Sequence, residues 1–138
     1  VYGFGASSIS QLHSAYSQNE KNSAKYIKRI EEDGLAVIRG YQMTDRDKIV
    51  RQMINEVMCN YYVDVNVIAK DFGITTENVY QAVEFSIDKF EEFIKDGLMD
   101  IEGDDIKVNE TGRLVIRNIA MKFDPLLTKG VGSYSKTI

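Results

Sequence analysis

Cysteine, histidine and proline are scarce in this sequence. Its 138 residues include one of each. The cysteine, Cys59, cannot form an internal disulfide, so nothing points to an oxidising compartment. We expect it to be a buried small hydrophobe and not a nucleophile, because no base lies near it in the sequence. The histidine, His13, has no Cys, Asp or Glu at ligand spacing beside it, so we expect no metal site.

Long hydrophobic runs and an excess of positive charge are also missing. No apolar run approaches the roughly 18 residues of a membrane span, and the first residues lack the basic segment of a signal peptide. The net charge is −4 and the isoelectric point is about 5.0, which argues against broad binding to phosphate. We therefore expect a cytoplasmic chain without membrane or nucleic-acid partners.

What remains is the composition of a packed protein. Hydrophobic residues make up 43% of the chain and charged residues 28%, as in ordinary soluble domains. The length fits one domain, or one domain with a piece of another. The chain starts at Val1 without an initiator methionine, and we interpret it as a sequence entered part-way through.

Glycines mark the first segment of the chain. Gly3 and Gly5 lie in the run Val-Tyr-Gly-Phe-Gly-Ala-Ser-Ser-Ile-Ser, which we interpret as the end of a strand that leads into a small-residue loop. A lone Gly-x-Gly is a weak motif, and a plain turn is the competing interpretation. Residues 11–22 show little periodicity and predict a loop or an irregular helix. A helix over residues 23–33 follows.

The character of the sequence changes near residue 42. We place a first domain at 1–42, a second at 43–125 and a flexible tail at 126–138. The second domain is predicted to contain helices at about 45–61, 65–72 and 76–96, a hairpin at 98–108 and a last helix capped by Asn109. This order is winged-helix-like, and the predicted fold class is mainly α with a small β-hairpin, that is, α+β.

A winged-helix order suggests DNA binding, but the charges argue against it. Between Thr75 and Asp96, six acidic residues stand against two basic ones. The predicted hairpin tip at residues 103–105 is acidic as well. Such a surface repels phosphate instead of releasing its counterions.

Three arginines are candidates for binding anionic groups. Arg39 stands beside a glycine and could clamp a carboxylate, or it could pair with Glu31 or Glu32. Arg113 and Arg117 are four residues apart and therefore share one helix face. They could hold an anionic ligand, or they could pair with surface acids.

Several short blocks, taken together and in order, carry a family resemblance. The strongest are residues 96–98 (Asp-Gly-Leu) and 112–124 (Gly-Arg-Leu-Val-Ile-Arg-Asn-Ile-Ala-Met-Lys-Phe-Asp). The others are residues 3–10 (Gly-Phe-Gly-Ala-Ser-Ser-Ile-Ser), 16–21 (Tyr-Ser-Gln-Asn-Glu-Lys), 39–41 (Arg-Gly-Tyr) and 57–60 (Val-Met-Cys-Asn). As a set they resemble the C-terminal part of oxygen-independent coproporphyrinogen III oxidase, a radical S-adenosylmethionine family of haem biosynthesis.

This resemblance implies a longer parent protein with a catalytic barrel of βα units. Three thiolates of a Cys-x-x-x-Cys-x-x-Cys motif in that barrel would hold a 4Fe–4S cluster, which binds S-adenosylmethionine. The resulting 5′-deoxyadenosyl radical would take hydrogen from the β-carbon of a propionate, and loss of CO₂ and one electron would leave a vinyl group. Two such steps would turn coproporphyrinogen III into protoporphyrinogen IX.

The chain lacks what this oxidoreductase chemistry needs. With one cysteine it cannot hold the cluster, so the resemblance implies a fragment that is inactive alone, binds no cofactor and has the parent's barrel as its partner. Residues 1–42 would be the end of that barrel and a linker, with residues 1–10 as the end of a late barrel strand and its loop, and with Ile9 against an S-adenosylmethionine. Arg39, Arg113 and Arg117 would be candidates for the substrate's propionates, and the second domain would help to enclose the substrate.

Two other interpretations stay open. The related haem chaperone shares the barrel but lacks decarboxylase activity, and the block at 112–124 favours the oxidase over it. A free-standing winged-helix module that binds a protein or a nucleic acid belongs to a different functional class.

Overall fold

The computed structural model describes residues 1–128, and the chain divides into two compact units. The first runs from Val1 to Asp45 and the second starts at Arg46, whereas the sequence placed the boundary after residue 42. Helices and small antiparallel sheets are both present, which confirms the α+β class. The predicted flexible tail begins within α7 (Pro125–Thr128), and its residues 129–138 lie outside the described residues.

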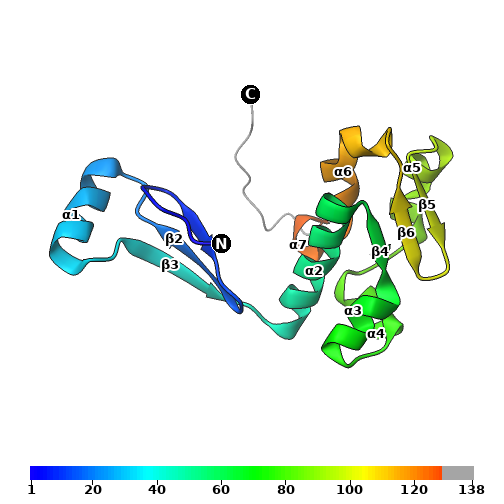
Figure 1. The fold of residues 1–138 in the computed structure, drawn as a ribbon, viewed down its shortest axis with the longest axis horizontal. Helices are drawn as coiled ribbons and strands as arrows, with labels where there is room; N and C mark the ends of the chain where they lie inside the picture. Colours follow the sequence, from blue (N-terminus) through cyan, green and yellow to red (C-terminus); the bar gives the residue numbers. More distant parts are fainter. Residues whose placement is uncertain (129–138) are drawn as a thin grey trace. The chain divides into compact units, whose positions relative to one another are not determined.

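The first unit is a three-stranded antiparallel sheet with one helix (Figure 1). Its strands are β1 (Ile9–Gln11), β2 (Ala15–Asn19) and β3 (Val37–Gln42), in the order β1-β2-β3. The loop or irregular helix predicted for residues 11–22 is therefore wrong over β2. The backbone of β2 pairs with β1 on one side and β3 on the other. This pairing makes the segment a strand, although its sequence lacks the alternation of apolar and polar residues that would predict one.

The helix predicted for residues 23–33 is confirmed as α1 (Ser23–Asp33). The side chain of Asn22 accepts a hydrogen bond from the backbone N–H of Lys25 at 3.0 Å, which satisfies an otherwise unpaired donor of the first turn. Gly34 ends the helix at φ 71°, a conformation that glycine adopts without strain.

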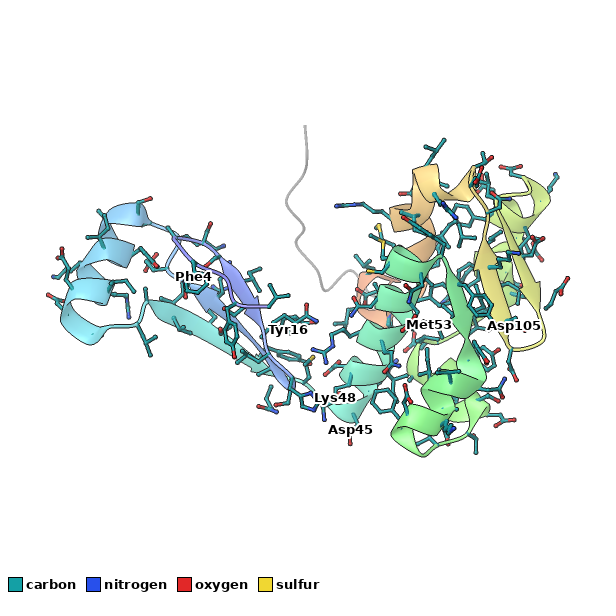
Figure 2. The ribbon with its side chains drawn as sticks, in the orientation of Figure 1. Phe4, Tyr16, Asp45, Lys48, Met53 and Asp105 are labelled. Atoms are coloured by element: carbon teal, nitrogen blue, oxygen red, sulfur yellow. The ribbon has the colours of Figure 1, made fainter. Side chains whose placement is uncertain are left out.

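Apolar side chains of the first unit are largely uncovered. Ala36 and Met43 are its buried hydrophobic residues, and every residue of β3 is exposed. Phe4, labelled in Figure 2, is 90% exposed, and Leu35 is 70% exposed. The first unit therefore exposes several large apolar side chains and has little core of its own.

The second unit contains the hydrophobic core. Its first helix, α2 (Asp45–Asn60), buries Ile49, Met53 and Val57 along one stripe, and Figure 2 labels Met53 on this helix. β4 (Tyr62–Asp64) and α3 (Val65–Phe72) follow. The other buried members of the core cluster are Val63, Val65, Ile68, Ala69, Val79, Ala82, Val83, Phe90, Met99, Ile106, Val108, Ile119, Ala120 and Phe123.

Cys59 is exposed, so the prediction that it is a buried hydrophobe is wrong. The buried positions of α2 are spaced four apart, and Val57 is the last of them. Two residues further along, a side chain points about 200° around the helix from that stripe. Cys59 therefore lies away from the core.

The predicted hairpin is confirmed as β5 (Met99–Glu102) and β6 (Asp105–Val108). Glu102 pairs with Asp105 across a two-residue turn, and Gly103 takes φ 60°, as the first position of a type II′ turn requires. The sheet order is β4-β6-β5. The hairpin thus extends a sheet that begins with β4.

The last helix predicted to follow Asn109 is shorter and begins later than expected. Asn109 accepts a hydrogen bond from the backbone N–H of Gly112 at 2.9 Å. A 3₁₀ turn, η2 (Gly112–Val115), leads into α6 (Ile116–Met121), which buries Ile119 and Ala120.

The single helix predicted for residues 76–96 is wrong. The segment forms α4 (Thr76–Ala82), the 3₁₀ turn η1 (Ile87–Lys89) and α5 (Glu91–Lys95). Glu84 at the break has φ 48°. The break brings Phe85 to a ring-centroid distance of 5.5 Å from Phe90. The helix is therefore interrupted where these aromatic rings pack together.

Arg46 supports this break from α2. Its Nε donates to the carbonyl of Ala82 at 2.9 Å, and its Nη2 forms a 2.8 Å salt bridge with Glu84. The unpaired carbonyls of a helix C-terminus favour such a cation.

A tyrosine of α4 forms a hydrogen bond with the hairpin turn. The hydroxyl of Tyr80 donates to Oδ1 of Asp104 at 2.8 Å. Burial and this hydrogen bond raise the pKa of Tyr80 above its usual value of 10.0. The folded state therefore favours the protonated phenol.

We expect Tyr80→Phe to lower the free energy of unfolding at neutral pH by about 1.5–3 kcal/mol, the value of a hydrogen bond to a charged acceptor. Because the pKa is raised on folding, the contribution is complete below pH 10 and is lost as the pH rises above it. Urea unfolding at a series of alkaline pH values should show that the free energy of unfolding falls less steeply with pH in the variant than in the parent chain. If the free energy of unfolding falls equally with pH in both proteins, the hydrogen bond of Tyr80 does not contribute to stability as expected.

Candidate functional site

Residues 3–10 form a loop held by side chains. Asn19 Nδ2 donates to the carbonyl of Gly5 at 3.1 Å and to Ser8 Oγ at 3.0 Å. A Cβ atom at Gly3 would lie 2.7 Å from the carbonyl oxygen of Ile9, so the loop requires glycine there. No strand covers residues 1–8, and the strand end predicted for this run is wrong. The first strand begins at Ile9, because its pairing partner β2 lies after the loop.

The register of the first sheet brings two predicted site residues together. Ile9 pairs with Gln18, and Gln18 pairs with Arg39. Residues directly opposite in antiparallel strands place their side chains on the same face. Ile9, Gln18 and Arg39 therefore form one row across the sheet. Tyr16, labelled in Figure 2, and Tyr41 form a neighbouring pair two positions along.

Arg39 does not form the ion pairs considered from the sequence. It is exposed, and among residues 1–128 it makes no salt bridge with Glu31 or Glu32. Glu32 instead lies 3.7 Å from Lys28 along α1. An arginine without an acidic partner can take an external carboxylate.

Arg113 lies in η2 and is held by an aromatic ring. Its guanidinium carbon is 4.3 Å from the centroid of the Tyr61 ring, within the range of a cation–π interaction. Tyr61 has φ 58° and packs against the core cluster. The contact orients the guanidinium without neutralising its charge.

Arg117 lies one turn further along, in α6, and borders a groove of about 450 Å³. The groove runs between α2 on one side and α6 with α7 on the other. Its lining is mostly apolar and consists of Ile54, Met58, Arg117, Ala120, Met121, Asp124 and Leu127. Such a volume lies within the range of small-molecule sites.

A second groove, of about 570 Å³, flanks the other side of α6. Met121 and Leu127 line both grooves, while Glu92, Asp96 and Lys122 make the second one more polar. The two acids there disfavour an anionic ligand, so Arg117's groove is the better candidate for one.

The structure thus places Ile9 and Arg39 in one row of the first sheet, and it places Arg113 and Arg117 in the consecutive segments η2 and α6. Each pair lies within one unit. Sequence reasoning missed Gln18 and Tyr61, which lie between or beneath the predicted residues. Neither position carries a local signal, because cross-strand and cation–π partners are set by the tertiary structure.

Metal sites need clustered ligands, and membrane spans need long apolar helices. Within residues 1–128, no group of three or more His, Cys, Asp or Glu side chains is arranged to hold a metal ion. None of the helices formed by those residues is both long and apolar enough to cross a membrane.

Comparisons with known proteins identify what the chain is related to. No family model matches it. An oxygen-independent coproporphyrinogen III oxidase of Salmonella typhimurium is 36% identical over 127 residues, covering 92% of this chain and 27% of that protein. One of Thermostichus vulcanus is 36% identical over 140 residues, covering 100% of this chain and 42% of that protein. The chain matches the C-terminal part of an oxygen-independent coproporphyrinogen III oxidase.

A solved structure supports this relation. The coproporphyrinogen III oxidase of Escherichia coli, described as a radical SAM enzyme, superposes with a TM-score of 0.75 at 33% identity. The match covers 88% of this chain and 27% of that one. The chain spans 27% to 42% of the length of these oxidases, so the resemblance in the sequence is confirmed for a part of the family's protein.

The cluster of such an enzyme does not fit the residues of this chain. A radical SAM cluster is held by three cysteine thiolates, and the chain has one cysteine. Cys59 is exposed on α2, with no second thiol to join it.

Proposed function

We propose that this chain is the substrate-enclosing part of a coproporphyrinogen III oxidase and has no activity of its own. The observation that carries the proposal is the match to oxidases over nearly the whole chain, which spans 27% to 42% of their length. The single cysteine supports the absence of activity. In the parent, coproporphyrinogen III would be converted to protoporphyrinogen IX with S-adenosylmethionine and a 4Fe–4S cluster held elsewhere, in the cytoplasm.

The uncovered surface of the first unit supports a partner. Ala36 and Met43 do not amount to a hydrophobic core, while Phe4, Leu35 and Tyr41 are 52% to 90% exposed. The proposed partner is the rest of the parent chain, of which residues 1–10 would be a barrel remnant. The loop at residues 3–10, with Ile9 on its edge, would then face the barrel's cofactor.

The second unit is proposed to be winged-helix-like. Its order of α2, β4, α3, α4 and a hairpin, with the sheet order β4-β6-β5, supports that description. Its role would be to close over the substrate, with Arg113 and Arg117, like Arg39, as partners of propionates. The oxidase names of the relatives favour this role over that of a haem chaperone or a free-standing module.

A chimaera tests the proposal. This chain would replace the matching part of the Salmonella typhimurium oxidase, and the purified chimaera would be supplied anaerobically with coproporphyrinogen III, S-adenosylmethionine and a reductant. We expect protoporphyrinogen IX from the chimaera and none from this chain alone, because the chain lacks the thiolates for the cluster. A chimaera that carries its cluster, by visible absorption, and yet converts no substrate would contradict the proposal. Activity of the isolated chain would contradict it as well.

A further inference from the structure

The described part of the second unit carries two arginines without a salt bridge close to each other in the chain, and one of them, Arg117, borders the apolar groove. Arg113 and Arg117 are exposed, and within residues 1–128 neither makes a salt bridge. Arg113 lies in the 3₁₀ turn η2 and Arg117 in α6, which follows η2 directly in the chain. The two guanidinium groups can therefore contact two anionic groups that are close neighbours.

Both arginines are tied to the groove. Arg117 lines it directly. Arg113 lies over Tyr61, whose backbone N–H donates to the carbonyl of Val57 at 3.2 Å. That hydrogen bond continues the turn of α2 that contains Met58, a residue of the groove lining. The pair therefore stands where the apolar lining begins.

The residues around Arg113 and Arg117 favour a ligand that has anionic groups on an apolar body. Acidic residues outnumber basic ones between Arg46 and Thr128, yet among residues 1–128 none of these acids forms a salt bridge with Arg113 or Arg117. The acid in the groove lining, Asp124, uses Oδ1 to accept the backbone N–H of Leu126 at 2.9 Å, at the start of α7. Ile54, Met58, Ala120, Met121 and Leu127 offer the apolar contact. Two carboxylates on an apolar ring system satisfy both parts of the site.

We propose that Arg113 and Arg117 bind two neighbouring propionates of a tetrapyrrole whose ring edge lies in this groove. The inference rests on the proposed function and deepens it. In coproporphyrinogen III, one pair of propionates flanks a common bridging carbon, and this pair is the one that protoporphyrinogen IX retains. A site for the retained pair holds substrate, intermediate and product by the same two carboxylates. The propionates that lose CO₂ are then free to face the reacting centre.

Isomeric porphyrins test the inference with this chain as it is. Coproporphyrin III has the neighbouring pair, whereas coproporphyrin I has the same four propionates with no two flanking one bridge. Mesoporphyrin IX has only the neighbouring pair. In fluorescence titrations we expect similar Kd values for coproporphyrin III and mesoporphyrin IX, and a Kd at least about tenfold higher for coproporphyrin I, since losing one charge-assisted contact is worth that factor or more.

Substitutions test whether the two arginines cause the preference for coproporphyrin III over coproporphyrin I. Arg113→Gln and Arg117→Gln should each raise the Kd for coproporphyrin III about tenfold and abolish the preference between isomers. Arg117→Lys should recover part of the affinity, because it keeps the charge but not the fork-shaped set of donors. Lys122→Gln is the matched control: it removes one charge from the same helical segment beside the other groove, and it should leave the preference intact. Far-UV circular dichroism checks that each variant is folded.

The outcomes separate the inference from the proposed function. Equal binding of isomers I and III, or a preference that survives both arginine substitutions, would overturn the inference. An active chimaera would then leave the proposed function standing. Conversely, a chimaera that carries its cluster but is inactive, together with an arginine-dependent isomer preference, would refute the proposed function and retain the site.

Discussion

Gly112→Ala is expected to destabilise the second unit by about 3 kcal/mol or more. A Cβ atom at this position would lie 2.1 Å from the carbonyl oxygen of Leu98 and 2.7 Å from Cγ1 of Val108. The first neighbour is backbone and cannot rotate away, so the connection between the hairpin and η2 must shift. Overpacking of a core costs about 1–3 kcal/mol and sometimes more, against a total stability of about 5–15 kcal/mol for a typical domain.

Gly73→Ala is the matched control for this clash. Gly73 has φ 64°, and a Cβ atom added there would have no heavy atom within 4 Å, so the substitution costs only backbone strain of about 1–2 kcal/mol. Urea unfolding followed by circular dichroism would compare both variants with the parent chain. A loss of less than about 1 kcal/mol for Gly112→Ala would show that the close approach is relieved at little cost.

Phe90→Ala is expected to lower the free energy of unfolding by about 3–5 kcal/mol, the cost of removing a buried aromatic ring. Phe90 is fully buried. Its ring centroid lies 4.6 Å from that of Phe123 and 5.5 Å from that of Phe85. Loss of the ring would leave a cavity between α5 and the end of α6, where these side chains meet.

Ile87→Ala tests whether the loss comes from burial. Ile87 lies in η1, three residues before Phe90, and is 46% exposed. Truncation to alanine at this partly exposed position should cost about 0.5 kcal/mol. Unfolding by urea or by heat provides the comparison. Similar losses for Phe90→Ala and Ile87→Ala would show that the aromatic cluster does not carry the stability of this segment.

Sequence patterns within a short segment predicted the structure correctly where that structure depends on the segment alone. The hairpin needed a Gly–Asp turn between alternating apolar residues, and Asn109 needed only an orphan N–H within its reach. Both features are found as predicted. The caps at Asn22 and Gly34 follow for the same reason.

Local signals failed where a distant segment decides the structure. The apolar spacing of residues 76–96 fits one helix, but the ring of Phe123, far along the chain, pairs with Phe85 and Phe90 when the helix is broken. β2 is a strand because β1 and β3 supply its hydrogen bonds. The predicted arginines were chosen from charge and from their place in the sequence, whereas the contact with Tyr61 and the groove depend on the packing of α2 against α6.

The sequence by itself determined the relation to the oxidases, the α+β class and the inability of this chain to hold a cluster with Cys59 alone. These follow from residue identity and order, which do not depend on the fold. Only the tertiary structure decided that Arg39 shares a row with Ile9, that Arg113 is held by Tyr61, and that Arg117 borders an apolar groove. Such contacts join residues far apart in the chain, and the free energy of packing that selects them is a property of the folded core.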